Sequence, residues 1–229
     1  MNEIILAIFQ AIELIVELDP KLIQITKLSL YISLTATLIG SLISIPIGGM
    51  IYYYEFWGKR TIINLIQTLY SVPTVLVGLF LFLLISQQGP FGFLKLLFTP
   101  TGMIIGQVLL ILPLLIGFTI TALVGVSTQI KELAISLGAS TYQTIITIII
   151  EARYAIMSAV ILGFGRAISE VGVAILIGGN IRGFTRTFTT AISLETSRGN
   201  LVLSIALGFI LLSLSLVINF LLNYLQGKD

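Results

Sequence analysis

The sequence predicts an all-α integral membrane protein, and three observations lead to that class. Of the 229 residues, 57% are hydrophobic and only 10% are charged, and the mean hydropathy is +1.10. A soluble domain usually has about a quarter of its residues charged, so a soluble enzyme is excluded. Four stretches without any charged residue run through 28–54, 61–94, 96–130 and 199–227. Lipid offers no partner for free backbone groups, so the segments that cross it are expected to be helical.

A bilayer crossing needs about 20 mostly apolar residues. On this basis we predict five transmembrane helices, near residues 28–51, 63–86, 102–124, 155–178 and 201–224. Pro46, Pro73 and Pro113 fall inside the predicted spans, and each removes a backbone donor and can kink its helix. No internal repeat divides the chain. We therefore expect one transmembrane domain, residues 21–229, which includes a loop at 125–153.

The N-terminal segment needs a separate interpretation. Residues 4–18 are apolar, but they are short for a crossing, and polar side chains gather on one narrow helical stripe. The stripe consists of Glu3, Gln10, Glu13 and Glu17. We predict an amphipathic helix that lies in the membrane interface over residues 1–20 and ends at Asp19–Pro20. A sixth span is the alternative.

The charges of the loops do not set the orientation, because Lys and Arg divide almost evenly between the two sides. Two weaker features favour a cytoplasmic 125–153 loop. The first twenty residues contain no Lys or Arg, and six aromatic residues reach one interface level, as an aromatic belt does. These residues are Tyr52, Tyr53, Tyr54, Trp57, Tyr154 and Tyr224. We expect a multi-pass protein of the cell membrane, with its N-terminus outside and its C-terminus in the cytoplasm.

Several kinds of chemistry are excluded by the composition. The chain has no Cys and no His, so disulfides, thiol catalysis and Cys/His metal sites are ruled out. A net charge of +2 is too small to indicate a nucleic-acid partner. No G-x-x-x-x-G-K-[ST] motif is present, so the chain does not bind ATP by that route. We expect no enzyme activity, no cofactor and no metal on the chain itself.

The loop at 131–154, KELAISLGASTYQTIITIIIEARY, predicts a short helix, a glycine turn and a second amphipathic helix. Its residues Glu132, Ala134, Gly138 and Ile148 match a spacing that resembles the signature loop of permease subunits in ABC-transporter importers. The family commonly has Ala and Pro where this chain has Leu133 and Glu151. The resemblance implies a type I importer-permease fold and a loop that docks on a separate ATPase, with Glu132 and Ala134 on the docking face. An ordinary hairpin at the membrane surface is the alternative.

A second resemblance points to the cargo. GFGRAISEVGVAILIGGN, residues 163–180, looks like the corresponding stretch of sulfate, molybdate and tungstate permeases, and residues 181–200 resemble the tungstate branch most. The resemblance implies that ATP and Mg bind to the ATPase partner, present in two copies. It also implies an extracytoplasmic solute-binding protein. Five spans are few for a pathway, so we expect a homodimer within the membrane lipid.

The fourth predicted span carries charged residues. Arg166 and Glu170 are four residues apart, so in a continuous helix they share one face and can pair. Ionisable groups within a span usually face an interior or a water path. Either this pair fixes helix packing, or it forms, with Ser169, a gate of the translocation pathway.

Residues 180–200 combine Arg side chains with hydroxyl groups, which suit an oxyanion. We predict a weak anion funnel in which Arg182 and Arg186 attract the ion, with Thr187, Thr189 and Thr190 as donors. A solvated loop that touches a partner protein is the alternative.

These observations predict the permease subunit of an ATP-driven importer for tungstate, with molybdate as the near competitor. An ion-gradient-driven secondary transporter of a small anion, with Glu170 as the ion site, is the alternative. A third class is a membrane protein that assembles with others and carries no cargo.

Overall fold

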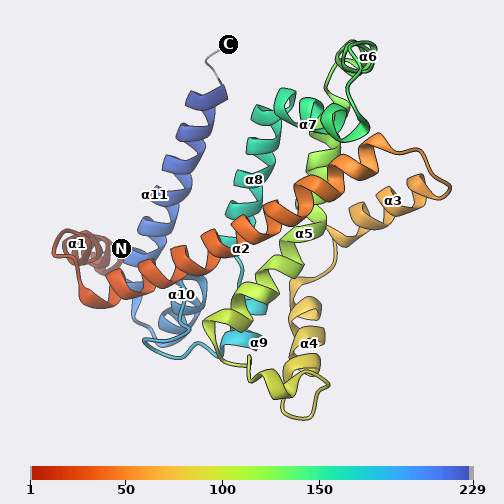
Figure 1. Ribbon diagram of the computed structural model, residues 1–229. Coiled ribbons are helices and arrows are strands. Elements are labelled where there is room, and N and C mark those ends of the chain that lie inside the picture. The colour runs from red at the N-terminus through yellow and green to blue at the C-terminus, as the bar shows by residue number, and fades with distance from the viewer. Residues whose placement is uncertain (1, 227–229) are drawn as a thin grey trace.

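A computed structural model describes residues 2–226, and within them the chain is helical with loops (Figure 1). The helices are α1 (Asn2–Val16), α2 (Pro20–Tyr53), α3 (Lys59–Leu69), α4 (Thr74–Ile85), η1 (Gly92–Leu94), α5 (Pro100–Val124), α6 (Thr128–Ser136), α7 (Thr141–Glu151), α8 (Arg153–Ile168), α9 (Gly172–Gly178), α10 (Phe188–Ser197) and α11 (Leu201–Gln226). The predicted all-α class is therefore confirmed for the described part of the chain.

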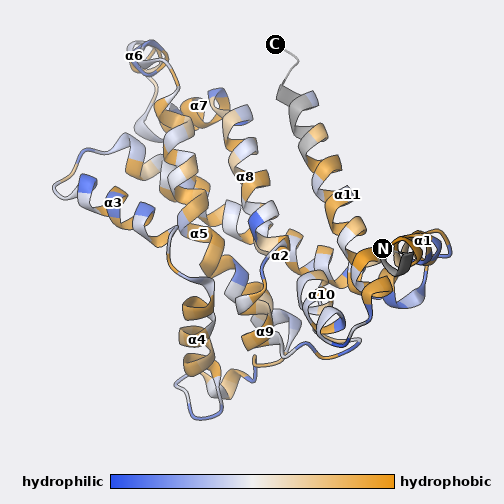
Figure 2. Cartoon of the chain, turned by 180° about the vertical axis from the view of Figure 1, so that it is seen from behind, coloured by the Kyte–Doolittle hydropathy of each residue, from blue (hydrophilic) through white to orange (hydrophobic). Residues whose placement is uncertain are grey.

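Three helices are long and apolar enough to cross a membrane unaided: α2, α5 and, within α11, Leu201–Ile218. Two bent pairs, α3 with α4 and α7 with α8, raise the number of candidate spans to five if each pair is one span. Figure 2 shows hydrophobic residues along most of α4, α5 and α11, whereas α3 carries hydrophilic positions. Local signals set the starts of the long helices. Asp19 accepts hydrogen bonds from the amides of Lys21 and Leu22 before α2, and Thr99 caps α5.

The predicted span at 63–86 is broken, because the chain bends by 97° between α3 and α4. Pro73 is the N-cap of α4, and its ring and missing donor prevent α3 from continuing through it. The twelve residues of α4 are about 18 Å long, which is too short to cross the membrane alone.

The predicted span at 155–178 is also broken. Helix α8 ends at Ile168 and α9 begins at Gly172. The sixteen residues of α8 extend about 24 Å, and α9 adds only a short segment after the break. Instead, α8 joins α7 through a bend of 71°.

The core is built around the packing of α2 on α5. Glycines on α2 allow close approach: a Cβ at Gly40 would lie 3.1 Å from a Leu115 methyl, and one at Gly48 would lie 2.8 Å from a Thr119 methyl. Buried hydroxyl residues also lie along α2, namely Ser29, Ser33, Thr37, Ser41 and Ser44. Small side chains thus replace bulky apolar ones where the two long helices meet.

Helix α1 packs against α11 through Ala11, Leu14 and Ile15, which join the same hydrophobic cluster as Phe188 and Leu207. Glu13 and Glu17 remain exposed. In Figure 1 and Figure 2 α1 lies across α11 rather than alongside it. This arrangement suits a helix in the membrane interface, and the interfacial position stays a prediction.

The helices define two ends. In Figure 1 α6, α7 and the C-terminal end of α11 lie at the top, whereas α9, α10 and the connection between α4 and α5 lie at the bottom. The predicted docking loop and the predicted anion funnel therefore occupy opposite ends of the molecule. We call them the α6–α7 hairpin (residues 125–153) and the outer loop (residues 179–200).

Candidate functional site

The α6–α7 hairpin is shaped by three local signals. The Ser127 hydroxyl accepts a hydrogen bond from the Gln129 amide at 3.3 Å and caps α6. After α6, Gly138 takes a φ of +81°, a left-handed conformation that glycine adopts without steric cost. Ser140 and Gln143 then form a reciprocal capping box at the start of α7. The predicted helix, glycine turn and second helix are confirmed.

The α6 helix presents apolar side chains to its surroundings. Leu133 is 60% exposed, Ile135 50% and Leu137 79%, while Glu132 is exposed and Ala134 is half-buried. Helix α6 packs chiefly against α7. A patch of exposed apolar residues at the tip of a hairpin marks a surface suited to a partner protein.

Ile148 lies elsewhere. It is 2% exposed and packs with Leu123, Ala152 and Ile156. Its side chain holds α7 against α5 and α8, so this residue of the predicted coupling loop packs inside the protein, and its part in ATPase coupling stays a prediction. By contrast, no atom lies within 4 Å of a Cβ built on Gly138, so that position is open to a partner.

At the break between α8 and α9, Arg166 and Glu170 do not share a continuous helix. The ion pairs among residues 2–226 join other groups, so the predicted Arg166–Glu170 pairing is wrong. Glu170 is 4% exposed, and its carboxylate accepts a hydrogen bond from the Val173 amide at 3.2 Å. It caps α9. Arg166 and Ser169 are exposed, and their role in a gate stays a prediction.

Both sides of this break are tied to other helices. The Gln107 side chain on α5 donates to the Ala167 carbonyl at 3.1 Å. The Thr189 hydroxyl on α10 donates to the Glu170 carbonyl at 2.6 Å. These two bonds satisfy backbone carbonyls that the interrupted helix leaves free. They therefore stabilise the break between α8 and α9.

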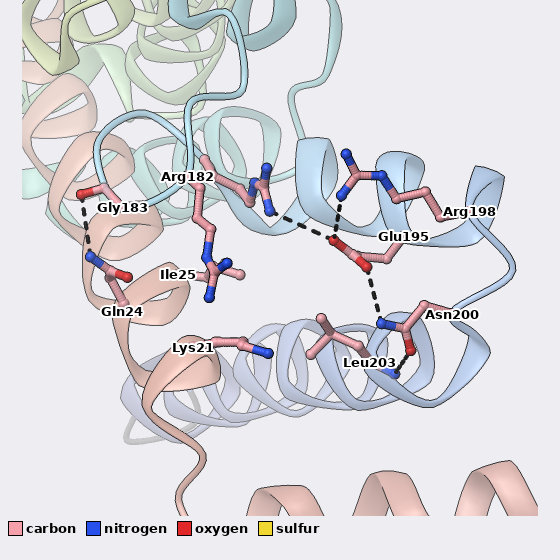
Figure 3. A pocket seen from close by; sticks show the side chains of 10 residues that line it. Lys21, Gln24, Ile25, Arg182, Gly183, Glu195, Arg198, Asn200 and Leu203 are labelled. Atoms are coloured by element: carbon pink, nitrogen blue, oxygen red, sulfur yellow. Dashed lines mark hydrogen bonds and ion pairs between the residues drawn. The ribbon is translucent and has the colours of Figure 1, made fainter.

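The outer loop borders a pocket of about 440 Å³ (Figure 3). The start of α2, the connection after α9, α10 and the start of α11 contribute its walls. Four cationic side chains and one carboxylate line it, together with amide and apolar groups. The lining residues are Lys21, Gln24, Ile25, Arg182, Gly183, Arg186, Glu195, Arg198, Asn200 and Leu203. We call this the outer basic pocket.

Glu195 organises one wall of the pocket. Its carboxylate lies 3.6 Å from Arg186 and 3.7 Å from Arg198, and it accepts a hydrogen bond from the Asn200 side chain at 3.0 Å. Arg186 also donates to the Asn180 side chain at 3.1 Å. Burial lowers the pKa of Arg186, Glu195 opposes this effect, and the neighbouring arginines add to it. Through its contacts with Glu195 and Asn180, Arg186 stabilises the conformation of the loop and also gives it positive charge.

The hydroxyl groups of the predicted threonine donors make hydrogen bonds within the protein. Thr187 and Thr190 are buried, at 5% and 0% exposure, and form the capping box of α10. The Thr189 hydroxyl is bonded to Glu170. The three hydroxyls therefore serve the fold, which corrects their predicted role as donors in the funnel. Arg182 and Arg186 do line the pocket, as the funnel hypothesis requires.

Sequence reasoning found Arg182 and Arg186 but missed the other residues that line this pocket. Lys21 and Gln24 lie more than 150 residues before Arg182 in the chain, and the Gln24 side chain meets the Gly183 carbonyl at 3.2 Å. Glu195 and Asn200 were not singled out either. Only the alternation of Arg with Glu and Asn between residues 182 and 200 hinted at an internal network.

A family model described as the inner membrane component of binding-protein-dependent transport systems matches residues 36–228. The chain belongs to this family. The predicted importer-permease class is thereby confirmed, and the match gives the chain the role of a membrane permease subunit. Membership of this ABC-transporter family implies an ATPase and a solute-binding protein as partners. The secondary-transporter alternative is not favoured.

Individual relatives agree with this assignment. A tungstate uptake system permease of Peptoclostridium acidaminophilum is 42% identical over 218 residues, covering 95% of this chain and 96% of the relative. One of Campylobacter jejuni is 39% identical over 217 residues, covering 95% and 91%. A sulfate transport system permease of Escherichia coli K12 is 26% identical over 217 residues, covering 92% and 75%. Similarity thus runs along nearly the whole chain.

Proposed function

We propose that this permease subunit carries tungstate into the cell, and that molybdate is its nearest competitor. The observation that carries the proposal is the similarity to tungstate uptake permeases along almost the full length of both chains. The two ions are close in size and charge, so we assign the choice between them mainly to the solute-binding protein. The chain has no ATP-binding motif, so ATP and Mg bind on the partner ATPase.

The hairpin is the proposed docking site for that ATPase. Leu133, Ile135 and Leu137 are exposed at its tip, and burying an exposed leucine contributes about 1.5–3 kcal/mol. Glu132 and Ala134 belong to the same short helix, and the open Gly138 turn admits close approach. Rigid attachment of α7 through Ile148 then transmits movement of the hairpin to α5 and α8.

Two copies of the chain, each with one ATPase, form the proposed transporter. Closure of the ATPases on ATP draws the two hairpins together, and the spans rock between inward-open and outward-open states. The hairpin end faces the cytoplasm in this proposal, together with the C-terminal end of α11. The N-terminus and the outer loop face the solute-binding protein, and the cations of the outer loop draw anions to that side.

Reconstitution tests the function. The chain, its ATPase and the solute-binding protein are placed in liposomes, and tungstate uptake is measured by elemental mass spectrometry. We expect uptake that requires ATP, persists when ion gradients are collapsed, and is inhibited by molybdate more strongly than by sulfate. Uptake that needs a gradient and ignores the ATPase would overturn the proposal.

A further inference from the structure

The cations of the outer basic pocket fall into two groups. Arg186 and Arg198 share the Glu195 carboxylate. Lys21 and Arg182 have no ion-pair partner among residues 2–226, and Figure 3 shows both side chains reaching into the space between the outer loop and α11. One carboxylate therefore faces four cations. A pocket with this imbalance attracts an anion.

Glu195, whose carboxylate is the one that lines the pocket, already has its partners. Glu195 is 7% exposed, and its two oxygens already meet Arg186, Arg198 and Asn200. It cannot also neutralise Lys21 and Arg182 from its side of the pocket. The guanidinium of Arg182 offers paired N–H donors that match the oxygens of a phosphate-like group, and Lys21 adds a compact charge.

The size of the pocket favours a group with some bulk. A pocket of about 440 Å³ has room for a tetrahedral oxyanion together with water or with the rest of a lipid head group. Ile25 and Leu203 give the pocket an apolar side. The first turns of α11 that border it also lie near α1, whose Leu6, Phe9 and Val16 are exposed. Cations beside exposed apolar surface are typical of the level of lipid head groups.

We propose that the outer basic pocket binds a tetrahedral oxyanion group, with Lys21 and Arg182 as its principal contacts. The group has two possible sources, the phosphate of an anionic phospholipid head group and a free oxyanion such as tungstate. The phospholipid source is independent of the transported cargo. The free-ion source rests on the proposed function, in which tungstate is the cargo.

The test uses the full-length permease purified in detergent, without its partners. One arm measures tungstate bound at equilibrium dialysis. The other arm transfers the protein to nanodiscs of phosphatidylcholine with a minor fraction of phosphatidylglycerol and counts the lipids retained after re-extraction. The test variant is Lys21→Gln with Arg182→Gln. Lys95→Gln is the matched control, because Lys95 is exposed in the connection between α4 and α5 and does not line the pocket.

We expect the wild type and the control to bind in at least one arm, and the double variant to bind about tenfold more weakly there, because charge-assisted hydrogen bonds are lost. Raising the salt concentration should weaken binding in the same way. Selective retention of phosphatidylglycerol identifies the lipid, and binding of tungstate identifies the free ion. Binding in neither arm, or equal binding by the double variant and the wild type, overturns the inference. Tungstate uptake by the reconstituted transporter would still support the proposed function in that case.

Discussion

The α6–α7 hairpin and the outer loop lie at opposite ends of the same helices, and they use their side chains in opposite ways (Figure 1). The hairpin leaves Leu133 and Leu137 exposed, and its helix α6 packs chiefly against α7. The outer loop buries Phe188 and Thr190 completely and pairs Arg186 and Arg198 with Glu195. The hairpin end therefore leaves apolar side chains exposed, whereas the outer loop buries its apolar side chain Phe188 and leaves a pocket lined by charged groups.

The two ends show that exposed apolar residues and hydroxyl residues differ in what they indicate about function. Apolar residues exposed on a short surface helix contribute little to folding, and they are the candidate contacts for a partner. Hydroxyl residues near arginines have many structural uses, because helix caps and backbone bonds consume them. Substitutions should therefore affect association at the hairpin and stability at the outer loop.

The largest effect is expected for Phe188→Ala in the outer loop. Phe188 is fully buried among residues of α1, α2, α8 and α11, and removing a buried phenylalanine costs about 3–5 kcal/mol. Thermal unfolding of the purified protein measures the change. Phe184→Ala is the control, because Phe184 is 50% exposed in the same loop. Equal loss of stability in both variants would contradict the packed character of this loop.

Next comes Leu137→Ala in the hairpin. Its side chain is 79% exposed, so folding should be unaffected, whereas ATPase binding should weaken by about 1.5–3 kcal/mol if the interface buries it. Titration of the labelled ATPase onto the permease in nanodiscs gives the affinity. Leu94→Ala, at the opposite end and 49% exposed, should leave the affinity unchanged. An unaltered affinity for Leu137→Ala removes this residue from the docking surface.

The left-handed backbone conformation of Gly138 offers a further test of the hairpin as a docking surface. Leu at a φ of +81° adds about 1–2 kcal/mol of strain, and its side chain also occupies the open approach to the turn. Gly138→Leu should weaken co-purification with the ATPase. Asn tolerates this conformation better, so Gly138→Asn should retain more of the complex. Full retention by the leucine variant would show that neither the turn nor its open space matters.

A smaller effect is expected for Thr190→Val. The hydroxyl accepts from the Thr187 amide at 3.0 Å, and loss of a helix cap costs about 1 kcal/mol. The unfolding temperature should fall slightly while tungstate transport by the folded fraction is retained. Ser193→Ala, on an exposed face of α10, is the control. If transport is lost without loss of stability, Thr190 contacts the ion after all.

The sequence predicted the helices well where one apolar run fills one span. Residues 28–51, 102–124 and 201–224 fall within α2, α5 and α11. It did not locate the breaks within 63–86 and 155–178, because hydropathy continues across each of them. Pro73 was noted as a possible kink, but its cap position before α4 depends on α3 turning aside. The break after Ile168 is held by Gln107 and Thr189 from distant helices, and no local pattern reports such contacts.

The candidate sites divide in the same way. The hairpin was predicted with its glycine turn, because local caps and a family spacing define it. The pocket was predicted only through Arg182 and Arg186. Its remaining residues come together through the meeting of α2 with the outer loop, which a single sequence does not display.

The absence of cysteine in the whole chain makes single-cysteine labelling the most direct test of the central claim, that the hairpin is the cytoplasmic docking site of the ATPase. Leu137→Cys and Arg198→Cys are treated with a membrane-impermeant maleimide in right-side-out and inside-out vesicles, with and without the ATPase. The account predicts that Leu137→Cys reacts only in inside-out vesicles and is protected by the ATPase, whereas Arg198→Cys reacts only in right-side-out vesicles. Labelling of Leu137→Cys from the outside, or no protection by the bound ATPase, would contradict it.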